Sequence, residues 1–312
     1  MTKRGILLLN MGGPNTLDEV ELFLRNMFAD PAILPMHPWL RKMIGNRIVK
    51  KRLHEAQENY RQLGGQSPLT GISKALAEKV EAQTGCITFP AMRYVPPFAD
   101  EALRTMQERG VEEIVCFPMY PQYSTTTTES SWQDVQEQCE AMGYTPSLHL
   151  AEPYYADPGY MDILLDRIRK ASVGIDTAEY TLILSAHGLP LSIIEAGDPY
   201  RDQIEASVVA MKKALKEAGM PFASVELAYQ SKVGNAAWLE PNLADLLRHP
   251  SSLKVMILPL AFTIDNSETH FELDVEHRLI ADKLGYDDYR VVSCPNDGDD
   301  FAKFIAEKIN VL

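Results

Sequence analysis

The sequence has few cysteines and no long apolar run. Its four cysteines, Cys86, Cys116, Cys139 and Cys294, form no C-x-x-C pair, so the usual spacing of a structural zinc site or an iron–sulfur cluster is missing. The longest apolar runs cover about eight residues, whereas a membrane-spanning helix needs roughly 18 to 20. We therefore expect buried free thiols and no transmembrane segment.

Positive charge is also in deficit. The 312 residues contain 30 Lys and Arg against 43 Asp and Glu, a net charge of -13, which disfavours nucleic acid as a partner. The N-terminal stretch MTKRGILLLNMGGP has too few apolar residues for the core of a signal peptide, so we expect a cytoplasmic protein. With 46% hydrophobic and 23% charged residues, the composition is that of an ordinary globular protein.

Short apolar runs alternate with longer segments of helical period, which predicts an α/β fold with parallel sheets. The predicted strands are 5–10, 88–94, 113–119, 147–151, 180–186, 224–229, 253–260 and 289–293. The predicted helices are 16–27, 50–62, 71–84, 98–109, 130–142, 158–171, 198–218, 238–247, 267–284 and 299–309.

The two halves of the chain look like one unit used twice. LLLNMGGP near Pro14 matches LILSAHGLP near Pro190 at an offset of 176 residues, and later strand ends match at smaller offsets. This decrease in the offset indicates an insertion in the first half of the chain, at about 28–65. We therefore predict two Rossmann-like lobes, 1–155 and 156–312, each with a parallel four-stranded sheet flanked by helices, and a ligand cleft between them.

His187 follows an apolar strand at its carboxyl end, where open α/β sheets place ligands. It is a candidate metal ligand or base, or else a structural histidine bonded to a backbone carbonyl. Glu268, Glu272 and Glu276 recur every four residues and so share one helix flank. They predict either a path for a divalent cation or a solvated acidic face.

Neighbouring residues have simpler interpretations. Asp265 or Ser267 is expected to cap the helix that carries these acids, and His270 and His277 are expected on its surface. Taken singly, LGGQSP at 63–68, the hydroxyl-rich run 121–131, QSKVGNAAW at 230–238 and the pair Arg93–Tyr94 favour turn chemistry or core packing.

The inserted segment has a composition of its own. Residues 32–40 (AILPMHPWL) are apolar and aromatic, and six basic residues follow within 41–52. The six are Arg41, Lys42, Arg47, Lys50, Lys51 and Arg52. This pattern suits a membrane surface, a flat apolar ligand with carboxylates, or an ordinary exposed helix.

Together these motifs resemble the ferrochelatase family. They run in order as LLNMGGP, GGQSP, MRYVPP, YPQYSTTTTESS, SAHGLP, YQSKVG with WLEP, and FTIDNSETHFELDVE. The resemblance implies a bacterial type without an iron–sulfur cluster, which inserts ferrous iron into protoporphyrin IX to form protohaem (haem b) in the last step of haem biosynthesis. It also implies that the porphyrin lies between the two lobes.

The resemblance also implies roles for single residues. His187 and Glu268 match the family's catalytic and metal-binding histidine and acid, and Glu272 and Glu276 fall on an acidic line that the family places on a π-bulged helix. The implied porphyrin-binding residues are Met11, Lys51, Arg52, Arg93, Tyr94, Tyr123, Ser130 and Trp238.

Some positions depart from the family pattern or narrow the substrate. Met11 stands where relatives that use coproporphyrin carry a tyrosine, which favours protoporphyrin IX. Asn266 replaces a common histidine, and His270 replaces a usual leucine. The resemblance implies no tightly bound cofactor, with Fe²⁺ as a substrate that Zn²⁺ or Co²⁺ can replace.

Several alternatives stay open. The chain could be another tetrapyrrole chelatase, acting on coproporphyrin III with iron or on sirohydrochlorin with cobalt, or a porphyrin or haem carrier without catalysis. A two-lobed solute-binding protein is disfavoured because we expect no export. Peripheral contact with an anionic membrane, at its inner face, is predicted through 32–52.

Overall fold

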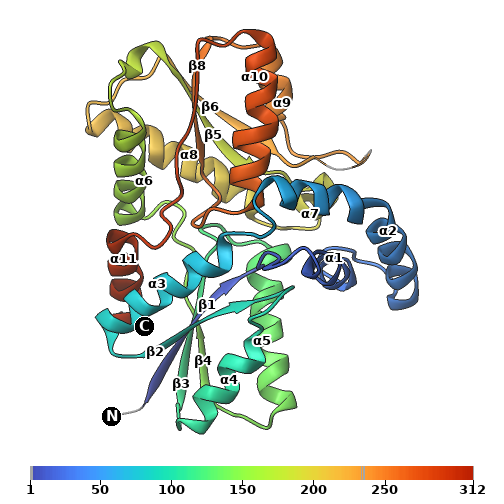
Figure 1. The fold of residues 1–312 in the computed structure, drawn as a ribbon. Helices are drawn as coiled ribbons and strands as arrows, with labels where there is room; N and C mark the ends of the chain where they lie inside the picture. Colours follow the sequence, from blue (N-terminus) through green and yellow to red (C-terminus); the bar gives the residue numbers. More distant parts are fainter. Residues whose placement is uncertain (1–2, 233, 235, 312) are drawn as a thin grey trace. The chain divides into compact units, whose positions relative to one another are not determined.

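The computed structural model describes residues 3–232, 234 and 236–311. Two parallel four-stranded sheets form the fold (Figure 1). The first has the order β2-β1-β3-β4 and the second the order β6-β5-β7-β8. The strands are β1 (Arg4–Asn10), β2 (Ile87–Met92), β3 (Glu113–Pro118), β4 (Ser147–Leu150), β5 (Thr181–His187), β6 (Ser224–Gln230), β7 (Lys254–Pro259) and β8 (Asp288–Val291). The eight predicted strands and the α/β class are thus confirmed.

The helices between the strands agree less closely with the prediction. The α-helices are α1 (Glu19–Ala29), α2 (Pro38–Gln62), α3 (Leu69–Thr84), α4 (Ala99–Glu108), α5 (Ser130–Ala141), α6 (Pro158–Ala171), α7 (Leu191–Glu195), α8 (Tyr200–Glu217), α9 (Leu243–Arg248), α10 (Arg278–Leu284) and α11 (Asp299–Asn310). Two π-helices, η1 (Thr125–Glu129) and η3 (Glu268–His277), follow β3 and β7, and a 3-10 turn, η2 (Thr177–Glu179), precedes β5. The sequence did not predict η1, η2 or α7.

The chain divides into two compact units. Unit 1 comprises Met1–Tyr120, Ser124–Glu152 and Asp297–Leu312, and unit 2 comprises Pro121–Tyr123 and Pro153–Asn296. The predicted division at 155/156 therefore lies near the observed crossover, but the last helix does not belong to the second lobe. Helix α11 packs against α3 in unit 1 because its apolar stripe of Phe301, Ile305 and Ile309 is fully buried there.

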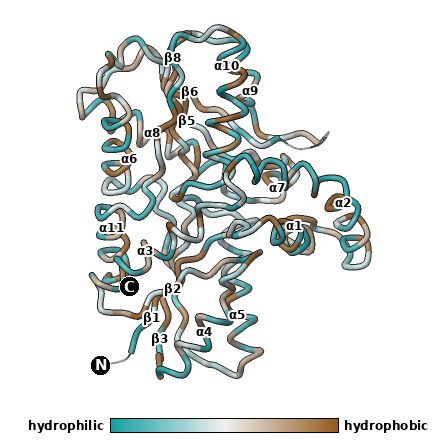
Figure 2. Tube along the Cα trace, viewed as in Figure 1, coloured by the Kyte–Doolittle hydropathy of each residue, from teal (hydrophilic) through white to brown (hydrophobic). Residues whose placement is uncertain are grey.

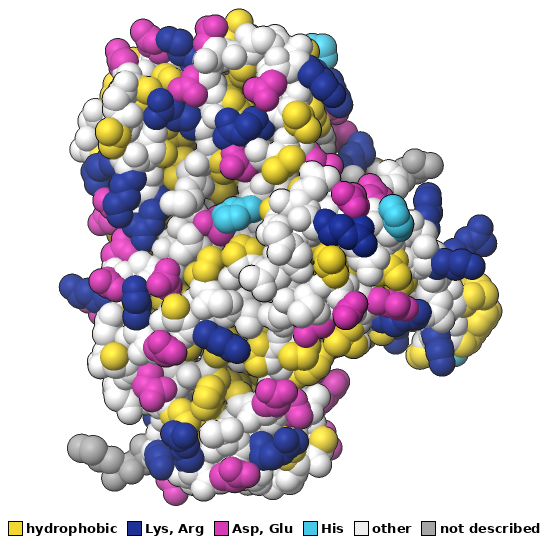
Figure 3. All heavy atoms as spheres, viewed as in Figure 1, with side chains coloured by type: hydrophobic (Ala, Val, Ile, Leu, Met, Phe, Trp, Pro, Cys, Tyr) yellow, Lys and Arg dark blue, Asp and Glu magenta, His cyan; other side chains and the backbone are white. Residues whose placement is uncertain are grey.

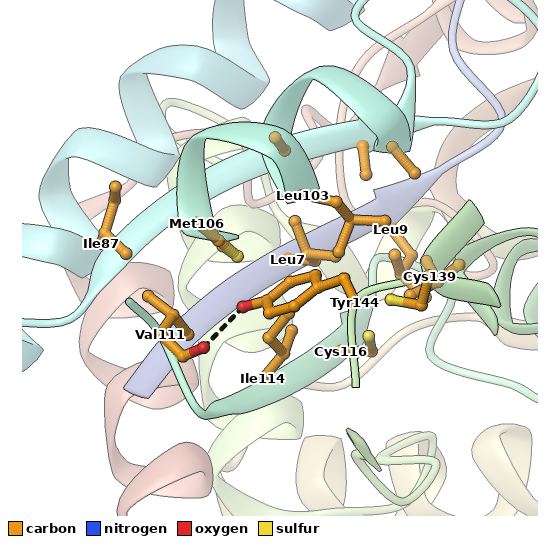
Figure 4. Packing of buried hydrophobic residues seen from close by; sticks show 14 residues of the cluster. Leu7, Leu9, Ile87, Leu103, Met106, Val111, Ile114, Cys116, Cys139 and Tyr144 are labelled. Carbon is orange, nitrogen blue, oxygen red and sulfur yellow. Dashed lines mark hydrogen bonds between the residues drawn. The ribbon is translucent and has the colours of Figure 1, made fainter. Parts of the chain in front are cut away.

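The core of unit 1 lies between its sheet and the helices α4 and α5. Leu7 and Leu9 of β1 pack against Leu103 and Met106 of α4, as Figure 4 shows. The hydroxyl of Tyr144 closes this core by donating to the carbonyl oxygen of Val111 at 2.7 Å. The apolar runs of the strands are buried on both faces, which is why they read as continuous rather than alternating.

The sheet of unit 2 repeats that of unit 1. Leu8 of β1 pairs with Phe117 of β3, and Leu184 of β5 pairs with Leu258 of β7, which reproduces the predicted offset of 176 residues. The core of unit 2 lies between its sheet and the helices η3, α9 and α10. The same strand order and register in both units support the duplication inferred from the sequence.

Helix α2 is the main addition in unit 1. It spans 25 residues and begins at Pro38, at the first helical position, where proline is favoured because no backbone N–H is needed. The predicted helix 50–62 covers only its second half. Figure 2 shows that α2 is mostly hydrophilic, and Figure 3 shows Lys and Arg side chains gathered over it. No helix among the described residues is long and apolar enough to cross a membrane.

Candidate functional site

His187 is the last residue of β5, and two hydrogen bonds fix it. The Nδ1 of His187 lies 2.6 Å from the carbonyl oxygen of Gly188. The hydroxyl of Tyr200 donates to the backbone carbonyl oxygen of His187 at 2.9 Å. Because a carbonyl oxygen only accepts, Nδ1 must donate, and a neutral imidazole then carries its lone pair on Nε2. The bond to a backbone carbonyl therefore orients the ring and leaves Nε2 as a base or metal ligand.

Gly188 lets the chain pass close to two neighbours of His187. Its N–H donates to the carbonyl oxygen of Gln230 at 2.8 Å. A Cβ atom at this position would lie 2.9 Å from that oxygen and 3.3 Å from Cε3 of Trp238. Trp238 also forms a β-bridge with Pro190. Trp238, a predicted site residue, thus lies beside the turn that follows His187 at the carboxyl edge of the sheet.

Glu268 begins helix η3, and Asn266 caps that helix. Oδ1 of Asn266 accepts from the N–H of Glu268 at 2.9 Å and from that of Thr269 at 3.2 Å, while its own N–H donates to the hydroxyl of Thr269. Ser267 occupies the N-cap position but its side chain makes no capping hydrogen bond, so the predicted side-chain cap by Asp265 or Ser267 is wrong. Asn266 is placed to cap because its side-chain oxygen reaches the free N–H groups of the first turn.

Asp265 is occupied elsewhere. It accepts from Nδ2 of Asn296 at 2.6 Å and lies 3.7 Å from Nε2 of His270. Burial alone would raise the pKa of Asp265, but the nearby His270 ring and hydrogen bonds from Asn296 and the N–H of Cys294 outweigh it and hold the pKa at about 2. The nearby Asp265 carboxylate in turn raises the pKa of His270. His270 is exposed, as predicted.

Residues at the end of β6 hold Glu272. Its carboxylate accepts from Nε2 of Gln230 at 3.1 Å, from the N–H of Ser231 at 2.6 Å and from the Ser231 hydroxyl. Ser231 reaches it from a left-handed backbone conformation, φ 66°, which is uncommon outside glycine and clusters at functional sites. A solvated acidic face therefore describes the exposed Glu276 but not Glu272.

The prediction that His277 lies on the helix surface is wrong. His277 is buried, and its Nδ1 lies 2.6 Å from the carbonyl oxygen of Glu272. His277 follows Glu272 by five residues, which is the hydrogen-bond spacing of a π-helix. The presence of Glu272 and Glu276 on such a helix agrees with the expectation from the resemblance.

The acids of η3 and His187 do not form a ready metal cage. Within residues 3–232, 234 and 236–311, no three His, Cys, Asp or Glu side chains lie close enough to hold one metal ion. The metal ligands predicted from the sequence, His187, Glu268, Glu272 and Glu276, therefore remain a prediction. Val233 and Asn235 of the YQSKVGNAAW run lie outside the described residues.

In unit 1, a buried carboxylate organises three of the predicted porphyrin-binding residues. Asp30, at the end of α1, is 4% exposed. It accepts from the hydroxyl of Tyr94 at 2.8 Å and from that of Ser130, and it lies 3.4 Å from Nη2 of Arg93. Arg93 also donates to Ser130 at 3.0 Å and lies 3.5 Å from Asp134. The sequence did not single out Asp30.

Tyr94 and Ser130 are part of the protein interior. Tyr94 is 2% exposed, and its ring packs edge-on against Phe23. Burial raises the pKa of Tyr94, and the nearby Asp30 raises it further, so its hydroxyl stays a donor. Because both hydroxyls are committed to Asp30, we expect them to hold Arg93 in place; as direct porphyrin contacts they remain predictions.

The other predicted porphyrin-binding residues are more accessible. Met11 is half-buried directly after β1 and packs against the apolar cluster of α1 and α2. Lys51 is exposed and Arg52 half-buried on α2, and within the described part of the chain neither makes an ion pair. Tyr123 is half-buried, and its N–H donates to Gln203 at 2.8 Å.

The sequence did not identify the residues that position predicted site residues through hydrogen bonds or close backbone contact. Asp30, Gly188 and Ser231 carried no separate signal, and Gln230 was only one letter of a motif. A buried acid or amide that bonds across elements far apart in the chain leaves no periodic pattern. Only its place at the start of the run 230–238, for which turn chemistry or core packing was predicted, could have drawn attention to it.

The fold is that of the α/β chelatases. The chain is similar to the sirohydrochlorin chelatase SirB from Bacillus subtilis subspecies spizizenii in complex with cobalt, with a TM-score of 0.56 and 9% identity over 77% of this chain and 87% of that one. It is also similar to SirB from Bacillus subtilis with Fe³⁺, with a TM-score of 0.59 and 12% identity over 99% and 95% of the two chains. At such identities the likeness establishes the fold alone.

The sequence comparisons are more specific. The family model Ferrochelatase matches residues 3–311. The chain is 44% identical over 310 residues to the ferrochelatase of Wolinella succinogenes, which covers 99% of this chain and 98% of the relative. It is 43% identical over 313 residues to that of Helicobacter pylori strain J99, over 99% and 93% of the two chains. The chain belongs to the ferrochelatase family and is therefore a metal chelatase, a lyase of haem biosynthesis.

Proposed function

We propose that this chelatase inserts ferrous iron into protoporphyrin IX and forms protohaem (haem b), the last step of haem biosynthesis. The observation that supports this most directly is the orientation of His187. Its Nδ1 is tied to the Gly188 carbonyl, so Nε2 offers a lone pair at the carboxyl edge of the sheet in unit 2. Metal insertion into a porphyrin needs such a group, because two pyrrole N–H protons must leave.

The residues divide the chemistry between them. His187 accepts a pyrrole proton or binds the incoming ion through Nε2. Glu268, half-buried at the start of η3, supplies a carboxylate for the metal or for a proton. Glu272 and the exposed Glu276 continue this line toward water along the same helix. Carboxylate oxygen and imidazole nitrogen together suit a divalent iron.

The porphyrin itself is recognised by apolar and cationic groups. Met11, Tyr123 and Trp238 present apolar surface to the macrocycle, and its burial supplies energy to distort the flat ring so that the pyrrole lone pairs turn toward the ion. Lys51 and Arg52 pair with the propionates, and Arg93 presents a guanidinium held by Asp30.

Protoporphyrin IX is the preferred tetrapyrrole because of Met11. Its thioether packs in an apolar cluster, where two vinyl groups are accommodated and additional propionates would lack polar partners. Iron is a substrate, which Zn²⁺ or Co²⁺ replaces, and no tightly bound cofactor takes part. The chelatase works in the cytoplasm.

Peripheral contact with an anionic membrane, at its inner face, is part of this proposal. Trp39 and Met43, four residues apart on α2, are 64% and 56% exposed. Basic residues of 41–52 lie on the same helix, as Figure 3 shows. Apolar side chains that enter the interface and lysines that meet anionic headgroups act together in such contacts.

The test is insertion of zinc into protoporphyrin IX, followed by fluorescence, since zinc avoids the oxidation that complicates iron assays. We expect turnover, and a higher kcat/KM for protoporphyrin IX than for coproporphyrin III. A higher value for coproporphyrin III, or for sirohydrochlorin with cobalt, would transfer the assignment to that substrate. Tight porphyrin binding without any turnover would indicate a carrier.

The contribution of α2 is tested by two sets of substitutions. Lys51→Ala with Arg52→Ala should raise the porphyrin KM more than it lowers kcat, because propionate contacts are alike in the ground and transition states. Trp39→Ser with Met43→Ser should weaken binding to vesicles of anionic lipid and leave turnover of porphyrin in detergent within about twofold. Unchanged vesicle binding at high salt would remove the membrane contact from the proposal.

A further inference from the structure

Both side-chain polar atoms and the backbone oxygen of Gln230 form hydrogen bonds within unit 2. It is the last residue of β6 and is 1% exposed. Its Oε1 accepts from the hydroxyl of Ser185 at 2.7 Å, and its Nε2 donates to the carboxylate of Glu272 at 3.1 Å and to the carbonyl oxygen of Glu268 at 3.2 Å. Its backbone oxygen accepts from the N–H of Gly188. One residue thus contacts the turn after His187 and the first two acids of η3.

The orientation of this amide follows from its partners. The carboxylate of Glu272 and the carbonyl oxygen of Glu268 only accept, so Nε2 must face them. A flipped amide would set Oε1 against both oxygens, an unfavourable contact between acceptors, and would take the Nε2 donor away from both. The hydroxyl of Ser185, fully buried on β5, completes the arrangement by donating to Oε1.

We propose that Gln230 is a positioning residue for metal insertion: it holds the turn after His187 and the acids of η3 in a fixed mutual arrangement. The proposal rests on the function proposed above, in which His187 and Glu268 are the reacting groups. Misplacing a reacting group by about 1 Å can cost on the order of 100-fold in rate. A residue that fixes both groups therefore acts on kcat rather than on porphyrin binding.

The neutrality of the amide is part of the role. A lysine or arginine at this place would also donate to Glu272, but its positive charge would pair with the carboxylate and repel a divalent cation. Gln230 and the N–H and hydroxyl of Ser231 instead orient Glu272 through neutral donors. The acid is thus fixed in space by neutral groups, with no cation of the protein bonded to it among these contacts.

The test compares Gln230→Leu, which keeps the volume, and Gln230→Glu, which keeps the acceptor for Ser185 and loses the donors, with a control. Asn242→Leu is the control, because Asn242 is also a hydrogen-bonded amide of unit 2 that caps α9 and contacts the Tyr229 carbonyl. We expect both Gln230 variants to lose about 10- to 100-fold in kcat for zinc insertion, with the porphyrin Kd within about twofold. The control should lower Tm and keep kcat within about twofold.

A third variant covers the case in which the Gln230 variants do not fold. Ser185→Ala removes only the donor that orients Oε1, and we expect about a 3- to 10-fold loss of kcat with unchanged porphyrin Kd. Wild-type kcat in folded Gln230→Leu or Gln230→Glu overturns the proposal, as does wild-type kcat in Ser185→Ala. A loss of kcat matched by Asn242→Leu at equal loss of Tm also overturns it, because the role is then structural.

Two further arms separate this inference from the proposed function. His187→Ala and Glu268→Gln should each abolish most zinc insertion while porphyrin still binds. If these variants keep activity, the proposed function of those residues fails whatever Gln230 does. If they lose it while the Gln230 variants do not, only the positioning role fails.

Discussion

The two units place different chemistry at the same positions of one fold. Met11 lies three residues after Leu8, and His187 lies three residues after Leu184, where Leu8 and Leu184 occupy equivalent places in their sheets. Arg93 likewise follows Met92, which pairs with Asn10, as Gln230 follows Tyr229, which pairs with Ala186. Thioether and guanidinium in unit 1 thus correspond to imidazole and amide in unit 2.

The π-helices extend this difference. Helix η1 follows β3 and contains four threonines and one glutamate, and Ser124 caps it by accepting from the N–H of Thr126 at 3.1 Å. Helix η3 follows β7 at the corresponding place and presents Glu268, Glu272 and Glu276. The carboxyl edge of each sheet determines where these residues are placed, and the proposed function assigns porphyrin binding to the edge in unit 1 and metal and proton transfer to the edge in unit 2.

The largest effect is expected from replacing His187, which ends β5, compared with replacing its counterpart Met11, which follows β1. His187→Met gives unit 2 the residue of unit 1 and removes the lone pair on Nε2, so kcat for zinc insertion should fall about 100- to 10,000-fold with porphyrin still bound. Met11→Leu, which keeps the apolar contact, should change kcat by no more than about threefold. Comparable losses in the two variants would contradict the division of roles.

The glycines that follow these residues should differ in stability. Gly12 has φ 85°, and a Cβ there would lie 2.6 Å from Val95, so Gly12→Ala should lower the free energy of unfolding by about 2–4 kcal/mol. Gly188 lies outside the left-handed region, and Gly188→Ala should cost about 1–3 kcal/mol through its contact with Gln230. Urea unfolding measures both; the reverse order would show that backbone conformation is not the cause.

The next largest effect is expected at Asp30, the buried carboxylate of unit 1. Asp30→Asn removes the charge that three donors share and should cost about 2–3 kcal/mol of unfolding free energy and raise the porphyrin KM through Arg93. Asp134→Asn is the control on the same arginine. Burial raises the pKa of Asp134, which means that the folded protein disfavours the charged carboxylate. Asp134→Asn should therefore lower the free energy of unfolding by less than about 1 kcal/mol. Equal costs would argue against Asp30 as the organising residue.

The smallest effect is a dependence of stability on pH. It should be seen for Asp265, which precedes η3, and not for Ser124, which precedes η1. Asp265 has a folded pKa of about 2, below its usual 3.8, so it stabilises the fold above pH 4 and loses this contribution as pH falls toward 2. Asp265→Asn should cost about 2 kcal/mol at pH 7 and roughly half of that at pH 3. Ser124→Ala, at the uncharged start of η1, should cost about 1 kcal/mol at both pH values. A cost for Asp265→Asn that does not change with pH would contradict the cause assigned to this pKa.

Prediction from the sequence succeeded where local pattern and burial agree. The eight strands were found because each is an apolar run bounded by turn residues, and the ends of these runs located His187 and the loops beside it. The first half of α2 was missed because only Gly45, Val49 and Tyr60 are buried along its 25 residues, which leaves little apolar periodicity. Helix η1 was missed because a run of threonines has low intrinsic helix propensity.

By itself, the sequence determined the class of fold and the repeat and singled out candidate reacting residues, because these follow from short-range patterns of apolar, turn and titratable residues. Only the tertiary structure decided what those residues bond to. The pairing of Asp30 with Tyr94 and Ser130, of Gln230 with Glu272, and the packing of α11 on α3 join positions far apart in the chain. Such contacts form because buried polar groups must find partners and apolar stripes must be covered, and the sheets decide which partners are near.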